Sequence, residues 1–175
     1  MEKILTFIFC AAIGLRLCAQ NTPAPVRLAI VSESSDAVAA ADLLTAEFSK
    51  NDRVQLLERT EIEKVIREQQ LSLNNLDCLK LGRLLGADGL LALQTVAEGT
   101  NIFLNAQLVA VKPGVILTDE RFGRPAQDAS AWAANIVSHF EPLLPKLGVL
   151  PQDAIPLSVV NFHAGVRTAE AAELE

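Results

Sequence analysis

The chain has 175 residues, of which 50% are hydrophobic and 21% charged, and its formal net charge at pH 7 is −6. This composition is typical of a folded protein with a packed core and excludes a chain that is disordered throughout. An acidic chain without a cluster of Lys and Arg lacks the basic face that nucleic acids require, and the absence of Tyr argues against a stacking platform for bases or sugars.

Residues 1–19 have the form of a signal peptide. Lys3 precedes an apolar run over residues 4–15, which has the length of a signal-peptide hydrophobic region and is too short to span a bilayer. Cleavage after Ala19 and cleavage after Gln20 both remain open. We therefore expect an exported, periplasmic protein, with an uncleaved interfacial anchor as an alternative.

The three cysteines bear on lipid attachment and on disulfides. Cys10 and Cys18 lie in the signal segment, so the exported chain keeps Cys78 alone and cannot form an internal disulfide. Lipidation of Cys18 is an open alternative, although Arg16 departs from the small residues that precede a lipidated cysteine. Cys78 lies in a leucine-rich segment, which favours a small core residue, with an intermolecular bridge as the other reading.

The first predicted elements are a linker over residues 20–25, a strand over 26–31 and an amphipathic helix. Residues 32–36 carry a turn, in which Asp36 is the expected helix cap. The helix buries one face at positions i, i+4, i+7 and i+11, which are Ala37, Ala41, Leu44 and Phe48.

The segment 54–93 predicts strand, helix, helix and strand. A short apolar strand over residues 54–57 precedes Thr60 and Glu63, whose spacing is that of a capping box, so we expect the first helix to begin at Thr60. Its inward face repeats at i, i+3, i+4 and i+7, which are Ile62, Val65, Ile66 and Gln69.

The second helix of this segment is leucine-rich. We expect Asn74 or Asn75 to cap it and Gly86 to end it in a left-handed conformation. Residues 90–93 then form a continuous apolar strand that is covered on both faces. The leucines expected to carry the core face of the helix are Leu76, Leu79, Leu81, Leu84 and Leu85.

Residues 100–122 predict an antiparallel hairpin that turns at residues 112–114, because both arms alternate with a period of two. A helix over residues 127–141 follows, and we expect Pro142 and Pro145 to stop it. Its expected inward residues are Ala129, Trp132, Ile136 and Phe140. The element order β-α-β-α-α-β-β-β-α predicts an α/β fold with a mixed β-sheet packed by helices, assigned to residues 26–148.

Residues 149–175 predict a linker followed by a tail that resembles the opening of a second copy of the domain. Residues 156–161 repeat the style of the first strand, and residues 168–174 repeat that of the first helix. We expect either a fragment of a tandem-domain protein or a short docking appendage.

No catalytic, cofactor-binding or metal-binding residue is predicted. Gly82, Gly86 and Gly89 lie between helix and strand, whereas a dinucleotide fingerprint lies between strand and helix, so they are interpreted as caps and turns. His139 and His163 have no partner at metal-ligand spacing, and His139 is expected to be a partly buried helix residue.

Other polar residues also have simple structural interpretations. Ser32, Ser34 and Ser35 lack a neighbouring general base. The acidic and basic residues of 58–68 form a solvated helix face stabilised by i,i+3 and i,i+4 pairs. Glu58 and Arg59 are interpreted as a strand-end pair that orients the next helix.

One set of residues between the second and third predicted strands carries a family resemblance: Glu58, Arg59, Glu68, Gln69, Leu71, Ser72, Leu81, Gly82, Leu84, Leu85, Gly86, Ala87 and Asp88. With these residues the chain resembles the CsgG-type family of bacterial envelope proteins, which is related to TolB N-terminal-like and LpoB-like domains. The resemblance covers about residues 27–122.

The resemblance implies a non-enzymatic protein that acts through contacts with other envelope proteins, as in outer-membrane assembly, curli assembly or protein secretion. Homo-oligomerisation and peripheral association with the outer membrane are open within it, and no cofactor is implied. Because the hairpin 100–122 ends in Asp119, Glu120 and Arg121 and lacks an aromatic girdle, we do not expect this chain to form a pore. The alternatives are a TolB N-terminal-like adaptor and a periplasmic enzyme or receptor whose site lies beyond residue 175.

Overall fold

The computed structural model describes residues 24–153, except for residue 33 and the segments 72–74 and 125–127. The expected signal peptide, the tail after residue 153 and His163 therefore lie outside the described residues. Within the described part, no helix is long and apolar enough to cross a membrane.

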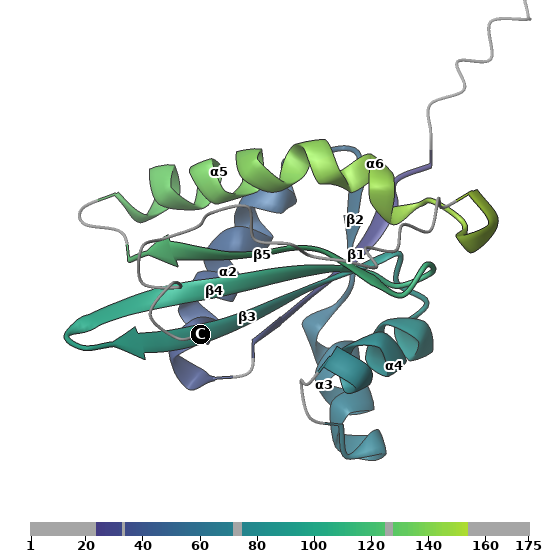
Figure 1. Cartoon of the computed structure of the whole chain (residues 1–175), viewed down its shortest axis with the longest axis horizontal. Coiled ribbons are helices and arrows are strands. Elements are labelled where there is room, and N and C mark those ends of the chain that lie inside the picture. The colour runs from purple at the N-terminus through teal and green to yellow at the C-terminus, as the bar shows by residue number, and fades with distance from the viewer. Residues whose placement is uncertain (1–23, 33, 72–74, 125–127, 154–175) are drawn as a thin grey trace, which may run out of the picture.

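A five-stranded mixed sheet forms the centre of the fold, with the strand order β2-β1-β3-β4-β5 (Figure 1). Strand β1 is parallel to its two neighbours β2 and β3, whereas β3, β4 and β5 form an antiparallel meander. The strands are β1 (Val26–Ser32), β2 (Val54–Leu56), β3 (Gly89–Glu98), β4 (Asn101–Ala110) and β5 (Val115–Gly123).

Helices cover both faces of this sheet. The four main helices are α2 (Ser35–Phe48), α3 (Arg59–Gln69), α4 (Asn75–Leu85) and α5 (Ala129–Phe140). Three short helical segments follow: η1 (Glu141–Leu143), α6 (Leu144–Leu147) and η2 (Pro151–Asp153). The mixed α/β fold and the element order expected from the sequence are confirmed.

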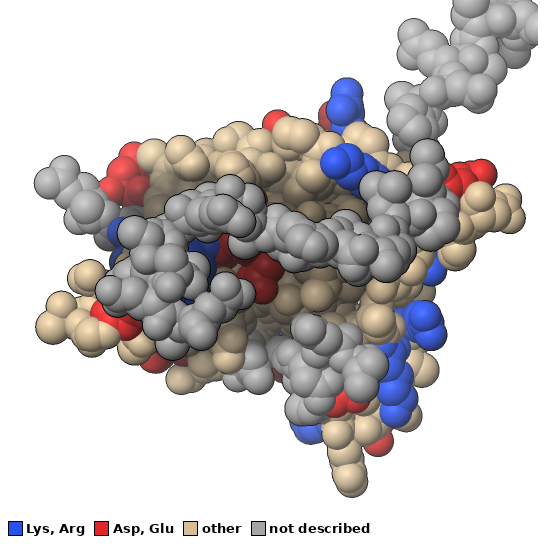
Figure 2. All heavy atoms as spheres, viewed as in Figure 1, with Lys and Arg blue, Asp and Glu red and all other residues tan. Residues whose placement is uncertain are grey.

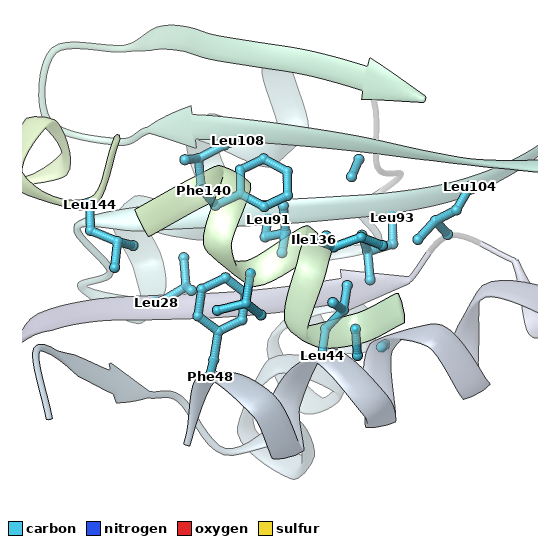
Figure 3. Close-up of a cluster of buried hydrophobic side chains, with 14 of the residues drawn as sticks. Leu28, Leu44, Phe48, Leu91, Leu93, Leu104, Leu108, Ile136, Phe140 and Leu144 are labelled. Atoms are coloured by element: carbon cyan, nitrogen blue, oxygen red, sulfur yellow. The ribbon is translucent and has the colours of Figure 1, made fainter. Parts of the chain in front are cut away.

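The larger core lies between the sheet and the pair α2 and α5 (Figure 3). Phe48 of α2 and Phe140 of α5 are its largest fully buried side chains, and Leu28, Leu91 and Leu108 meet them from three neighbouring strands. Alternation along each strand places these leucines on one face of the sheet. Burial of one such side chain contributes about 1.5–3 kcal/mol to folding, so this face supplies most of the packing energy.

The smaller core lies on the opposite face, under α3 and α4. It joins Ala29 and Val31 of β1 to Ile62 of α3 and to Cys78 and Leu81 of α4. In Figure 1 these two helices form a separate pair at the lower right, away from α2 and α5. The expected burial of Cys78 is confirmed.

The amphipathic helix α2 is confirmed, but its cap is not the expected one. The four positions expected to face the core, from Ala37 to Phe48, are all buried. The N-cap residue is Ser34, and Asp36 lies within the first turn. The Ser34 hydroxyl does not cap the helix, because it hydrogen-bonds the Thr95 hydroxyl of β3 at 3.0 Å.

The expected start of α3 at Thr60 is wrong by one residue. The helix begins at Arg59, its N-cap is Glu58, and no side chain caps it. The capping box does not form, because Glu63 accepts a hydrogen bond from Arg59 instead. Of the expected inward face, Ile62 is buried, Val65 and Ile66 are half-buried, and Gln69 is exposed because it lies in the last turn.

Helix α4 differs from expectation at Leu84, whose side chain is 51% exposed. Leu81 and Cys78 are fully buried in the smaller core, and the backbone of Gly82 lies against Val111. Asn75 is the first helical residue rather than the cap, and residue 74 lies outside the described part. Gly86 has a φ of +61°, which confirms the left-handed helix end.

The sheet continues further than the apolar run indicated. β3 extends from Gly89 to Glu98 and pairs with β4 along its whole length. A turn at Gly99, whose φ is +61°, connects the two strands. The second half of β3 is partly exposed, and this is why a hydrophobicity pattern did not reveal it. The second hairpin, from β4 to β5, is confirmed.

Helix α5 ends at Phe140, one residue before the expected end and ahead of Pro142. The chain then continues in the short helices η1 and α6, in which Pro142 and Pro145 occupy the first positions, where a missing N–H group costs nothing. Within α5, Ile136 and Phe140 are buried as expected, whereas Trp132 is only half-buried. The Asp128 side chain caps α5 by accepting hydrogen bonds from the backbone N–H groups of residues 130 and 131.

Candidate functional site

The candidate site is a cleft of about 520 Å³ beyond the carboxyl ends of β1 and β2. These adjacent parallel strands are followed by helices on opposite faces of the sheet, α2 after β1 and α3 after β2. Open α/β sheets place ligand-binding crevices at such topological switch points, because the two diverging helices leave space between them. We call this space the α2–α3 cleft.

The floor of the α2–α3 cleft is apolar. Four elements supply it: the end of β1, helix α2, the end of β2 and helix α3. The apolar lining residues are Ile30, Val31, Val38, Ala41, Leu56, Leu57, Ile62 and Ile66. Ile62 and Ala41 belong to the two cores, so the floor is continuous with packed and rigid parts of the fold.

Arg59 spans the rim of the cleft. Its Nη1 group donates to Asp42 Oδ1 of α2 at 2.9 Å, and its Nε group donates to Glu63 Oε1 of α3 at 2.8 Å. The three side chains are 50%, 64% and 54% exposed, so each ion pair contributes at most about 1 kcal/mol. Their effect is geometric, because they join the two helices that frame the cleft.

The electrostatics of the rim follow from these contacts. The hydrogen bond to Glu63 is the main cause of a raised pKa for the Arg59 guanidinium, and the charges of Asp42 and Glu63 act in the same direction. Glu58 is a further exposed carboxylate of the lining. The expectation that Glu58 and Arg59 orient the next helix holds for Arg59, which is the residue that links α3 to α2.

The amino end of α2 forms one end of the cleft. Ser34 and Ser35 line it, and the hydrogen bond from Ser34 to Thr95 fixes this end of α2 to β3. Among the described residues, no group of three or more His, Cys, Asp or Glu side chains is arranged to hold a metal ion. The cleft therefore offers an apolar surface with hydroxyl and ionic groups at its edge.

The residues after α4 form a structural clip at the other end of β1. Asp88 Oδ2 accepts from the Arg27 backbone N–H at 3.0 Å, and Asp88 Oδ1 lies 2.7 Å from Lys112 Nζ. Two further backbone hydrogen bonds, from the Asp88 N–H to the Arg27 carbonyl and from the Val111 N–H to the Asp88 carbonyl, complete it. The clip fixes β1 to the loop before β3 and to the end of β4.

Of the three glycines expected to be caps and turns, Gly86 has that role, whereas Gly82 lies inside α4 and Gly89 is the first residue of β3. A Cβ atom at Gly82 would lie 2.5 Å from Val111 Cγ2, so glycine allows α4 to approach the sheet closely. A Cβ atom at Gly89 would lie 2.6 Å from Leu147 Cδ1. Gly86 supplies the left-handed turn between them.

His139 is not the partly buried residue that was expected. It lies on the exposed side of α5, where its Nε2 atom is 2.6 Å from Glu120 Oε2 of β5 and its ring meets the edge of Phe122. This contact joins α5 to the edge strand, far along the sheet from the α2–α3 cleft. His139 therefore has a packing role.

Two further depressions lie elsewhere on the described surface. One, of about 310 Å³, lies between α2 and α5 and includes Trp132 and Arg124. The other, of about 550 Å³, lies between the end of α2 and α5 and is mostly polar. Figure 2 shows Lys and Arg side chains gathered on the visible edge of the α3–α4 pair, with Asp and Glu scattered over the rest of this face.

Sequence reasoning missed two side-chain contacts made by residues of the cleft, Arg59 to Asp42 and Ser34 to Thr95. Asp42 lies 17 positions before Arg59, and no local spacing rule indicates a contact over that distance. Thr95 lies 61 positions after Ser34, in the part of β3 that the hydrophobic pattern did not reveal. Both contacts are products of the strand order.

Comparison with known proteins adds no established function. No family model matches the chain, and no curated protein matches it. A similar solved structure is the LpoB C-terminal domain from Escherichia coli, with 20% identity and a TM-score of 0.48 over 63% of this chain and 90% of that one. Another is TolB from Acinetobacter baumannii, with 16% identity and a TM-score of 0.44 over 66% of this chain and 26% of that one.

A third is lipoprotein GNA1162 from Neisseria meningitidis, with 20% identity and a TM-score of 0.40 over 69% of this chain and 97% of that one. Because all three TM-scores are below 0.5, these similarities carry no argument about the activity or partners of this chain.

Proposed function

We propose that this chain is an exported component of the bacterial envelope that binds other envelope proteins, and that the α2–α3 cleft is its docking surface. The observation that supports the proposal is the form of the cleft. This space of about 520 Å³ at the carboxyl edge of the sheet has an apolar floor and is bordered by ionic side chains. Apolar centres with polar rims are typical of protein interfaces, where one partner inserts an apolar anchor and the rim excludes water.

The rim favours binding over turnover. A catalytic acid or base must be available to the reacting group, whereas Asp42 and Glu63 both accept hydrogen bonds from Arg59. We therefore propose a non-enzymatic role. The alternative is a periplasmic enzyme or receptor, and turnover by the purified exported chain that is lost on substitution of Glu58 or Arg59 would favour an enzyme.

The finer form of this proposal is a CsgG-type component of secretion or curli assembly. Its support is the resemblance carried by residues 58–88, which include helices α3 and α4 between β2 and β3 and the clip at Asp88. This form includes homo-oligomerisation and peripheral association with the outer membrane. The second candidate is a TolB N-terminal-like adaptor. The mass of the purified exported chain by light scattering tests the homo-oligomerisation that the first form includes.

Site-specific photo-cross-linking tests the docking proposal. A photo-reactive amino acid at Val38, which lines the cleft, is compared with the same amino acid at Ala46, which is exposed on α2 and does not line the cleft. The expected result is a discrete cross-link to an envelope protein from position 38 in intact cells, and none from position 46. Equal cross-linking at both positions, or none from position 38, contradicts the proposal.

A further inference from the structure

We propose that the occupant of the α2–α3 cleft is a basic amphipathic segment of a partner protein, in which an apolar anchor side chain is flanked by Lys or Arg. This inference rests on the proposed function and names the chemistry of the partner. The inference is supported by two neighbouring features of the cleft, which are its apolar floor and a rim on which carboxylates outnumber the single guanidinium.

The apolar floor determines which side chain of the partner can enter the cleft. The cleft volume of about 520 Å³ falls within the range of about 300–1,000 Å³ typical of ligand pockets, so the cleft has room for one or two large apolar side chains. Val38 and Ile66 are only half-buried, and an aliphatic or aromatic anchor would remove them from water. A polar anchor would be desolvated there without a hydrogen-bond partner.

The rim determines the flanking charge. Asp42, Glu58 and Glu63 contribute three carboxylates to the lining, and Arg59 contributes one positive charge. Asp36 and Glu61, in the first turns of α2 and α3, are also exposed and acidic. An acidic segment would meet this excess of negative charge without a partner, whereas Lys or Arg is complementary to it.

Arg59 makes the inference testable, because it occupies the same carboxylates that a basic partner would approach. If a basic segment binds, removal of the Arg59 charge leaves Asp42 and Glu63 available and strengthens binding. If the partner is acidic, Arg59 is its natural contact and the same substitution weakens binding. The two outcomes differ in sign.

Selection from a random twelve-residue peptide library displayed on phage provides the probe. The exported full-length chain is the target, and peptides are retained only when they bind the wild type and fail to bind Val38→Asn. Ala46→Asn is the matched control on the same helix. The expected result is enrichment of peptides with an aliphatic or aromatic residue beside Lys or Arg, whose affinity falls about tenfold in Val38→Asn and is unchanged in Ala46→Asn.

The enriched peptides are then measured by fluorescence anisotropy against charge variants. Arg59→Met is expected to raise affinity about two- to fivefold and the pair Asp42→Asn and Glu63→Gln to lower it, with both effects reduced at high salt. Glu68→Gln, outside the cleft, is the control for net charge. Cleft-dependent peptides that are acidic or uncharged, no cleft-dependent peptides at all, or weaker binding to Arg59→Met overturn the inference. If one of these results is found and position 38 still cross-links to an envelope protein, the proposed docking function is supported and only the basic character of the partner is wrong.

Discussion

Replacement of Asp88 should destabilise the fold through the backbone N–H group of Arg27. In the wild type, Asp88 Oδ2 accepts this N–H at 3.0 Å, and Asp88 Oδ1 pairs with Lys112 at 2.7 Å. Asp88→Ala removes both acceptors at the amino end of β1. Asp88→Asn keeps an oxygen acceptor for the Arg27 N–H group and removes only the charge.

The magnitudes follow from these two contacts. A hydrogen bond to a charged group contributes about 1.5–3 kcal/mol when it is buried, and this one lies near solvent, so Asp88→Ala should cost about 1–2 kcal/mol. Loss of the ion pair with the half-exposed Lys112 should cost no more than about 1 kcal/mol, which sets the limit for Asp88→Asn and for the control Lys112→Met. The difference between Ala and Asn at position 88 should therefore be about 1 kcal/mol.

Urea unfolding followed by circular dichroism measures these differences. The three variants should shift the midpoint without a change in the slope, because the surface exposed on unfolding is the same. If Asp88→Ala and Asp88→Asn are equally stable, the hydrogen bond to Arg27 contributes nothing and the clip is incidental.

Three further predictions concern the two cores. Gly82→Ala should lower the free energy of unfolding by about 1 kcal/mol, because a Cβ atom 2.5 Å from Val111 Cγ2 costs more than the gain in helix propensity. In a chain that also carries Val111→Ala, urea unfolding should show that Gly82→Ala is neutral or stabilising. Phe48→Ala should cost about 3–5 kcal/mol in the same assay, and a cost below about 1 kcal/mol would contradict the placement of Phe48 at the centre of the larger core. Cys78 is fully buried, so a maleimide should label the reduced exported chain slowly in buffer and rapidly in urea, whereas equal rates would show that α4 is not packed on the sheet.

The sequence predicted the elements whose apolar residues repeat regularly and face a core. The four buried positions of α2 from Ala37 to Phe48 are an example, because a period of 3.6 residues and burial on one side leave a direct record in the sequence. Local signals failed where another side chain competed for the same group. The capping box of Thr60 and Glu63 does not form, because Arg59 uses Glu63 and reaches across to Asp42.

The candidate site could be predicted only in part. Ile62 and Ile66 were expected to face the core, and they do, but the sequence did not indicate that α2 and α3 diverge there and leave a cleft. That feature depends on β1 and β2 being neighbours whose following helices lie on opposite faces. The order of strands in a sheet depends on contacts between distant residues, and local periodicity does not encode it.

The most direct test of the docking proposal is methyl chemical-shift mapping on the exported chain with the protein that cross-links to position 38. The account predicts that the methyl signals of Ile30, Val38 and Ile62 change on titration and that those of Val115 and Ile116, exposed at the start of the edge strand β5, do not. Changes confined to Val115 and Ile116 would contradict it and would identify the edge of the sheet as the binding surface.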